Sequence, residues 1–186
     1  MRTSEALQIL GKHRGEAIVV AAMSAAYEWA RISEHRLDLV YVPSAMAHGP
    51  GIALGLALAQ PERRVIAVNG DGCLLMDLGI LVTIVEAEAT NLALILLDNG
   101  IYAITGGQSI PGRGRTDFPA MARAAGFRQV AAFEDVASFG AALPGLLRAR
   151  GPTFVNLIVE PEAAGRAPSL AAMPERIERL RQELAR

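Results

Sequence analysis

Apolar residues in this chain gather in short runs that alternate with longer segments of helical spacing. Six short runs are rich in apolar residues, and they cover 17–22, 39–42, 65–68, 92–97, 127–132 and 152–159. Runs without polar interruptions, such as 65–68 and 92–97, are typical of strands covered on both faces of a parallel sheet. We therefore predict six strands that lie in one sheet.

The segments between these runs carry apolar residues three and four positions apart, as amphipathic helices do. The expected helices include 5–12 with Thr3 or Ser4 as N-cap, 52–58, a helix from Cys73 through Val85, 118–125, 134–150, and a last helix opened by Pro174. Alternating strands and helices predict an α/β fold with a doubly wound six-stranded parallel sheet and helices on both faces. We expect residues 1–186 to form a single domain in which 161–186 is an irregular strap plus C-terminal helix.

Composition narrows the functional classes. The chain has 186 residues, of which 52% are hydrophobic, and a formal net charge of −1. The mixed charges give no reason to expect a nucleic-acid partner or a polybasic membrane contact. A single cysteine, no secretory leader and no apolar run long enough to span a bilayer lead us to expect a cytoplasmic protein.

Two turns follow neighbouring buried runs. Gly70-Asp71-Gly72 comes directly after 65–68, and Asp98-Asn99-Gly100 comes directly after 92–97. Glycines let a ligand approach the backbone closely, and the free N–H groups at the start of a helix favour an anion. In open α/β sheets ligands bind outside the carboxyl ends of the strands, so we expect both turns to contribute to one anion site.

Asp71 and Asn99 are separated by 99 − 71 = 28 positions and can converge at adjacent strand ends. A carboxylate and a carboxamide beside an anion site suit Mg²⁺, which completes its octahedron with phosphate and water. Asp71 as a simple turn-former or helix cap is the alternative interpretation.

The pattern GDG followed by a helix, a strand and DNGIY resembles the diphosphate-binding signature of thiamine diphosphate (ThDP) enzymes. The wider stretch 41–108, with MAHGPGIALGLALAQPERRV and TGGQ, is similar to the C-terminal, pyrophosphate-binding (PP) domain of sulfopyruvate and phosphonopyruvate decarboxylases, including the beta subunit of the former. The resemblance implies ThDP and Mg²⁺ as cofactors, and a metal site made by Asp71, Asn99 and the carbonyl of Ile101.

The same resemblance implies roles for further residues. It assigns the diphosphate to backbone around Gly70, Gly72, Cys73 and Ile104, and the aminopyrimidine to Ser44 and Met46. Met46 matches the bulky residue that wedges between the cofactor rings, although Met46 as core filler is the alternative. His48 would assist proton transfer or bind an acidic substrate group, with a solvated surface histidine as the alternative.

The resemblance further implies decarboxylation of a small 2-oxo acid, of sulfopyruvate or phosphonopyruvate type. Such enzymes also need a pyrimidine-binding (PYR) domain with a catalytic glutamate, for which this chain offers no matching context. We therefore expect a beta-type subunit that acts with a separate alpha (PYR-domain) subunit and self-associates in a hetero-oligomer. Another ThDP carboligase, similar to acetolactate synthase, or a non-catalytic phosphate- or nucleotide-binding regulatory module are the alternatives.

Overall fold

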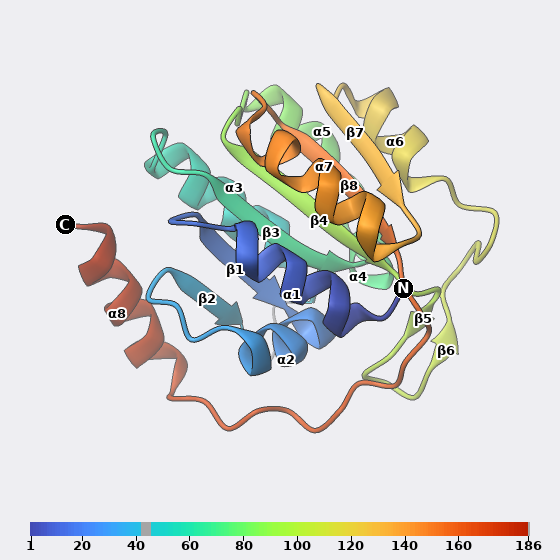
Figure 1. Ribbon diagram of the computed structural model, residues 1–186, viewed down its shortest axis with the longest axis horizontal. Helices are drawn as coiled ribbons and strands as arrows, with labels where there is room; N and C mark the ends of the chain where they lie inside the picture. The colour runs from blue at the N-terminus through green and yellow to red at the C-terminus, as the bar shows by residue number, and fades with distance from the viewer. Residues whose placement is uncertain (42–45, 186) are drawn as a thin grey trace.

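A six-stranded sheet in the order β2-β1-β3-β4-β8-β7 forms the centre of the molecule (Figure 1). The computed structural model describes residues 1–41 and 46–185. Every neighbouring pair in this sheet is parallel. The strands are β1 Ile18–Ala22, β2 Asp38–Tyr41, β3 Val65–Gly70, β4 Leu92–Asp98, β7 Gln129–Phe133 and β8 Thr153–Ile158.

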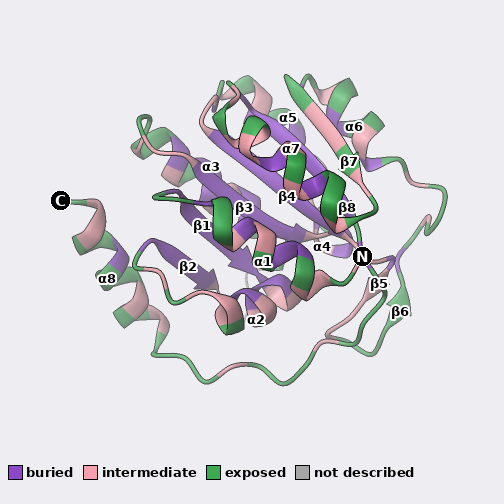
Figure 2. Cartoon of the chain, in the orientation of Figure 1, coloured by how far each residue is buried: buried purple, intermediate pink, exposed green. Residues whose placement is uncertain are grey.

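Helices cover both faces of this sheet. One face packs against α1 (Thr3–His13), α2 (Met23–Ile32) and α7 (Val136–Arg148), and its core holds the buried Trp29. The other face packs against α3 (Gly49–Ala59), α5 (Ile80–Glu86), α6 (Phe118–Ala125) and α8 (Met173–Leu184). Strands β1, β3, β4 and β8 are mostly buried, whereas the edge strand β7 and the outer sides of the helices are partly or fully exposed (Figure 2). The predicted doubly wound fold is confirmed.

The polypeptide between β3 and β4 differs from its prediction. Apolar spacing predicts one helix from Cys73 through Val85, but the structure has α4 (Asp71–Met76) and then α5, separated by a turn at 77–79. The N–H of Asp77 bonds to the carbonyl of Leu74, and the N–H of Ile80 bonds to the carbonyl of Asp77. A break of this length leaves the apolar spacing almost unchanged, so periodicity does not reveal it.

Two further details also depart from expectation. The first helix begins at Thr3 and has Arg2 at its N-cap, so neither Thr3 nor Ser4 is the cap. Part of the glycine-rich stretch after β4 forms a short antiparallel ribbon, in which β5 (Ile101–Tyr102) pairs with β6 (Gln108–Ser109). The ribbon is too short to leave a period-2 pattern in the sequence.

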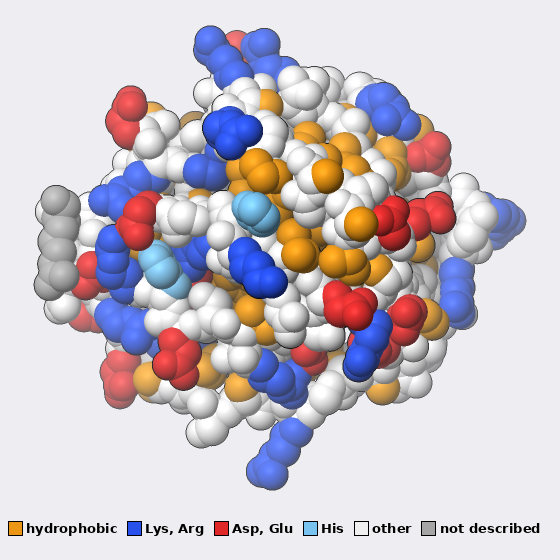
Figure 3. Space-filling view, in the orientation of Figure 1, with side chains coloured by type: hydrophobic (Ala, Val, Ile, Leu, Met, Phe, Trp, Pro, Cys, Tyr) orange, Lys and Arg blue, Asp and Glu red, His pale blue; other side chains and the backbone are white. Residues whose placement is uncertain are grey.

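After β8 the chain runs without regular structure through 159–172 and passes β5, β6 and α2 before it forms α8 (Figure 1). On the face seen in Figure 3, acidic and basic side chains are interspersed. Within 1–41 and 46–185, none of the helices combines the length and apolar character needed to cross a membrane.

Candidate functional site

A pocket of about 210 Å³ opens where β3 and β4 end. The register of these parallel strands pairs Gly70 with Leu97, so the turns that follow them emerge next to each other. The pocket is lined by Met23, Ser24, Met46, Gly70, Asp71, Gly72, Cys73, Met76, Asn99 and residues 101–105. The two turns singled out by the sequence therefore meet in one pocket.

The carboxylate of Asp71 is held by backbone N–H groups from both turns. Its Oδ1 accepts a hydrogen bond from the N–H of Gly72, and its Oδ2 accepts one from the N–H of Gly100, each at 2.6 Å. The residue is 1% exposed. Burial, with a smaller contribution from the neighbouring Asp98, raises the pKa of Asp71 to about 6, although the two N–H groups act against this shift.

This raised pKa means that the charged carboxylate lacks the solvation it would have in water. A cation beside it would offset that cost, because an opposite charge favours the ionised form. The carboxylate oxygens each keep lone pairs beyond the N–H contact, so Asp71 has acceptor capacity left for a metal ion.

Asn99 is oriented by its own turn. Its Oδ1 accepts a hydrogen bond from the N–H of Ile101 at 2.9 Å, which fixes the carboxamide against the backbone of β5. Gly100 between them has φ +72°, a conformation that glycine adopts without strain. Asn99 and Ile101 both line the pocket with Asp71.

Gly72 packs directly against the ring of Tyr102. A Cβ added at Gly72 would lie 2.6 Å and 2.7 Å from Cε1 and Cδ1 of Tyr102, and 3.2 Å from Cγ2 of Ile110. Only glycine lets the first turn of α4 sit this close to β5. The contact links the two turns that line the pocket.

We expect Gly72→Ala to destabilise the protein by about 1–3 kcal/mol, because the tyrosine ring must move to admit the methyl group. Gly70→Ala is the matched control, since a Cβ at Gly70 meets nothing within 4 Å. Its effect should stay within about 0.5 kcal/mol. Urea unfolding of both variants measures the difference, and equal losses of stability would contradict the role given to Tyr102.

Cys73 and Met46 both line the pocket, but Cys73 is partly buried whereas Met46 is exposed. Burial, with a smaller contribution from Asp71, raises the pKa of the Cys73 thiol to about 11, so the thiol stays protonated near neutral pH and is not a nucleophile. Met46 is 45% exposed, and its backbone φ of +39° is uncommon for a residue other than glycine. Its exposure makes the core-filler interpretation wrong in this chain.

One predicted site residue, His48, is not brought into the pocket. His48 is exposed at the end of the 3₁₀ helix η1 (Met46–His48), and it is not among the lining residues. Ser44 lies outside the described residues.

Met23 and Ser24 directly follow β1, and this strand-end position is the signal that places their loop beside the pocket. Sequence reasoning gave no role to Met76 or Tyr102, which also line the pocket. Tyr102 stood inside the quoted DNGIY motif, but only the packing on Gly72 reveals its contact. Met76 reaches the pocket because α4 ends there, and the break after it was not predicted.

A parallel sheet with hard oxygen atoms and backbone N–H groups beyond the ends of two adjacent central strands is the arrangement of α/β domains that bind phosphorylated cofactors. Residues 19–157 match the family model described as "Thiamine pyrophosphate enzyme, C-terminal TPP binding domain". The chain belongs to this family and contains its thiamine pyrophosphate-binding domain.

Similar proteins include two kinds of decarboxylase. The chain is 36% identical over 145 residues to a phosphonopyruvate decarboxylase of Streptomyces hygroscopicus, with 78% of this chain and 36% of the relative covered. It is 41% identical over 121 residues to the sulfopyruvate decarboxylase subunit beta of Methanothermobacter thermautotrophicus, with 65% and 62% covered. The chain thus spans about a third of the first relative and less than two thirds of the second.

Solved structures of similar fold agree on the architecture. The benzoylformate decarboxylase of Polynucleobacter necessarius matches with a TM-score of 0.75 at 19% identity, covering 88% of this chain and 34% of that one. A thiamin diphosphate-dependent enzyme from Mycobacterium smegmatis matches with a TM-score of 0.74 at 22% identity, covering 86% and 32%. At these identities the likeness concerns the fold alone.

Proposed function

We propose that this chain binds ThDP together with Mg²⁺ and acts as the beta-type subunit of a 2-oxo acid decarboxylase of the sulfopyruvate or phosphonopyruvate type. The observation that carries the proposal is the meeting of Asp71, Asn99 and Ile101 in one pocket beside the Gly70–Gly72 backbone. The similarity to sulfopyruvate decarboxylase subunit beta and to phosphonopyruvate decarboxylase supports the reaction class.

The chemistry of the donor set fits the two cofactors. Asp71, the carboxamide of Asn99 and the carbonyl of Ile101 are hard oxygen donors, which Mg²⁺ prefers, and three of them leave room for diphosphate oxygens and water. The described residues hold no group of three or more His, Cys, Asp or Glu side chains suited to a metal. The single buried carboxylate of Asp71 therefore suits an ion that shares its charge with a diphosphate.

The remaining lining residues would bind and orient the organic part. The backbone at Cys73 and Ile104 would donate N–H groups to the diphosphate, whereas the N–H of Gly72, also expected to do so, is donated to Oδ1 of Asp71. The exposed Met46 would press between the cofactor rings. Bound ThDP supplies the electron sink for loss of carbon dioxide from a 2-oxo acid. Apolar neighbours such as Met76 would keep water from the reacting groups.

His48 is proposed to act from the rim of the site. It lies two residues after Met46, at the start of α3, and its exposure leaves it able to meet groups that a partner brings to the pocket mouth. Proton transfer, or contact with the acidic group of the substrate, are the roles that imidazole chemistry allows there.

A PYR-domain alpha subunit is the proposed partner, and a cytoplasmic hetero-oligomer is the proposed setting. The sulfopyruvate decarboxylase relatives named as beta subunits support a partner chain. The partner would cover the pocket mouth, where Met46 and Met76 are 45% and 50% exposed. It would also supply the glutamate that activates the aminopyrimidine.

The function is tested by coexpressing this chain with a candidate PYR-domain chain and supplying ThDP, Mg²⁺ and sulfopyruvate or phosphonopyruvate. The expected products are carbon dioxide and the corresponding aldehyde. A hydroxyketone or acetohydroxy acid as the main product would indicate a carboligase. Absence of Mg²⁺-dependent ThDP binding in calorimetry, with the partner present, would favour a regulatory module.

Met46→Ala should lower turnover by about 10- to 100-fold at saturating ThDP, because the cofactor rings lose the contact that orients them. The affinity for ThDP should fall much less, since the diphosphate and metal contacts remain. Met121→Ala is a control, because Met121 is an exposed methionine on α6 that does not line the pocket. Turnover equal to the wild type in Met46→Ala would contradict the wedge role.

A further inference from the structure

The C-terminal segment contacts the turn that lines the candidate site and the last turn of α2. In the irregular part, the N–H of Ala164 donates to the carbonyl of Ala103 at 3.3 Å, and Nη2 of Arg31 donates to the carbonyl of Arg166 at 2.7 Å. Ala103 lies in the turn that lines the pocket, between Ile101 and Ile104. The segment therefore contacts the pocket turn before it reaches α8.

Helix α8 then lies along β2, which is the edge strand of the sheet (Figure 1). Leu180 is 5% exposed and anchors the helix in the core that includes α3. Nη1 of Arg176 donates to the carbonyl of Val40, and its Nε donates to the carbonyl of Ala171 at 2.9 Å. An edge strand has backbone groups without a neighbouring strand, so the guanidinium supplies a partner that the sheet cannot.

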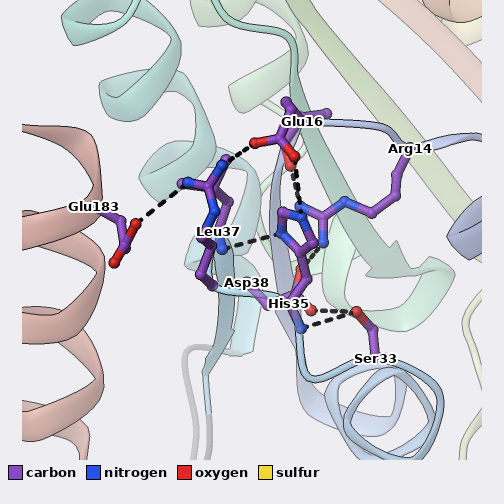
Figure 4. A network of polar contacts seen from close by, with 9 residues as sticks. Arg14, Glu16, Ser33, His35, Leu37, Asp38 and Glu183 are labelled. Carbon is purple, nitrogen blue, oxygen red and sulfur yellow. Dashed lines mark hydrogen bonds and ion pairs between the residues drawn. The ribbon is translucent and has the colours of Figure 1, made fainter. Parts of the chain in front are cut away.

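The beginning of β2 is fixed by other residues (Figure 4). Asp38 forms a buried ion pair with Arg14 and accepts a hydrogen bond from the hydroxyl of Ser33. Arg36, just before the strand, pairs with Glu183 of α8 at 3.3 Å. These contacts do not involve Arg176, so the two ends of β2 are held separately.

We propose that Arg176 is a positioning residue for the cofactor site, because its contact with the Val40 carbonyl fixes the end of β2 from which the chain continues to Met46 and His48. This inference rests on the proposed function of Met46 in cofactor binding. Val40 is six positions before Met46 in the sequence. We therefore expect a shift of the strand end to displace Met46 and His48, which are described residues that follow β2 in the chain.

Arg176→Ala is expected to raise the dissociation constant for ThDP about tenfold, as loss of one hydrogen bond to a charged group would allow. Amide hydrogen exchange at 38–41 and 46–49 should become faster in the same variant, with and without ThDP. Arg176→Lys keeps the charge but offers a single flexible donor group, so it should recover part of the affinity. The measurements use the full chain with its partner.

Arg181→Ala is the matched control. Arg181 is on the same helix, and its guanidinium donates hydrogen bonds to the carboxylate of Glu178 of α8 itself, at 2.9 Å. It should leave both the ThDP affinity and the exchange at 46–49 as in the wild type. If Arg181→Ala changes the ThDP affinity and the exchange as much as Arg176→Ala does, loss of helix stability causes the effect, and the proposal is overturned.

Two further results would also overturn it. One is a ThDP affinity and an exchange pattern in Arg176→Ala that match the wild type. The other is faster exchange throughout the sheet, which would indicate general destabilisation. If the wild type itself binds no ThDP, the proposed function fails, and the exchange at 38–41 and 46–49 alone decides whether Arg176 fixes the end of β2.

Discussion

Asp71→Asn should weaken Mg²⁺-dependent ThDP binding by at least about 100-fold. Residues that only support metal ligands typically change affinity 10- to 100-fold, so loss of a direct anionic ligand should cost at least the upper figure. The variant keeps nearly the same side-chain volume, and the core around β3 should remain folded. Isothermal titration of ThDP at fixed Mg²⁺ measures the loss.

Asp77→Asn is a fitting control for this experiment. Asp77 follows the same short helix and is half-buried, but it does not line the pocket. Its substitution should leave the ThDP affinity unchanged. An unchanged affinity in Asp71→Asn would instead show that the buried carboxylate holds the turns together and does not ligate the ion.

The stability of the metal-free protein should fall as the pH rises through about 6, with Asp71 as the cause. Burial raises the pKa of Asp71 from 3.8 to about 6 in the folded protein. A group whose folded pKa is raised contributes stability that is fully present below its unfolded pKa and is lost as the pH rises through the folded pKa. A shift of this size corresponds to about 3 kcal/mol.

Urea unfolding between pH 4 and pH 7.5 tests this dependence by comparing wild type with Asp71→Asn at each pH. The wild type should lose about 2 kcal/mol relative to the variant across this range, because part of the total loss already occurs below pH 4. Mg²⁺ with ThDP should restore the wild type at pH 7.5 and have little effect on the variant. If the difference in unfolding free energy between the two proteins does not change with pH, ionisation of Asp71 is not the cause of the pH dependence.

The fold could be predicted from the sequence because the inner strands of its sheet, β1, β3, β4 and β8, are almost wholly buried. Residues 65–70 and 92–98 are covered on both faces, so their apolar runs had no periodicity to confuse with a helix. The GDG and DNG turns were placed correctly for the same reason, since a parallel sheet brings the ends of adjacent strands to one edge.

The rest of the site depends on contacts that local patterns do not record. Tyr102 reaches Gly72 only through the fold of the β5–β6 ribbon, and Met76 reaches the pocket only because α4 stops after it. The hydrogen bond from Arg176 to Val40 joins residues 136 positions apart in sequence. Neither apolar spacing nor a short motif can reveal a contact between residues so far apart in the sequence.

Trp29, the chain's only tryptophan, gives the protein a built-in optical probe. Its indole is 0% exposed in the core beneath α1, α2 and α7, and its helix begins with Met23 and Ser24 at the pocket. The tryptophan emission of the native protein should therefore lie at short wavelength, and it should shift to longer wavelength when unfolding exposes Trp29 to water. Fluorescence can thus follow unfolding without any label, and a change in intensity on adding ThDP would report movement of α2.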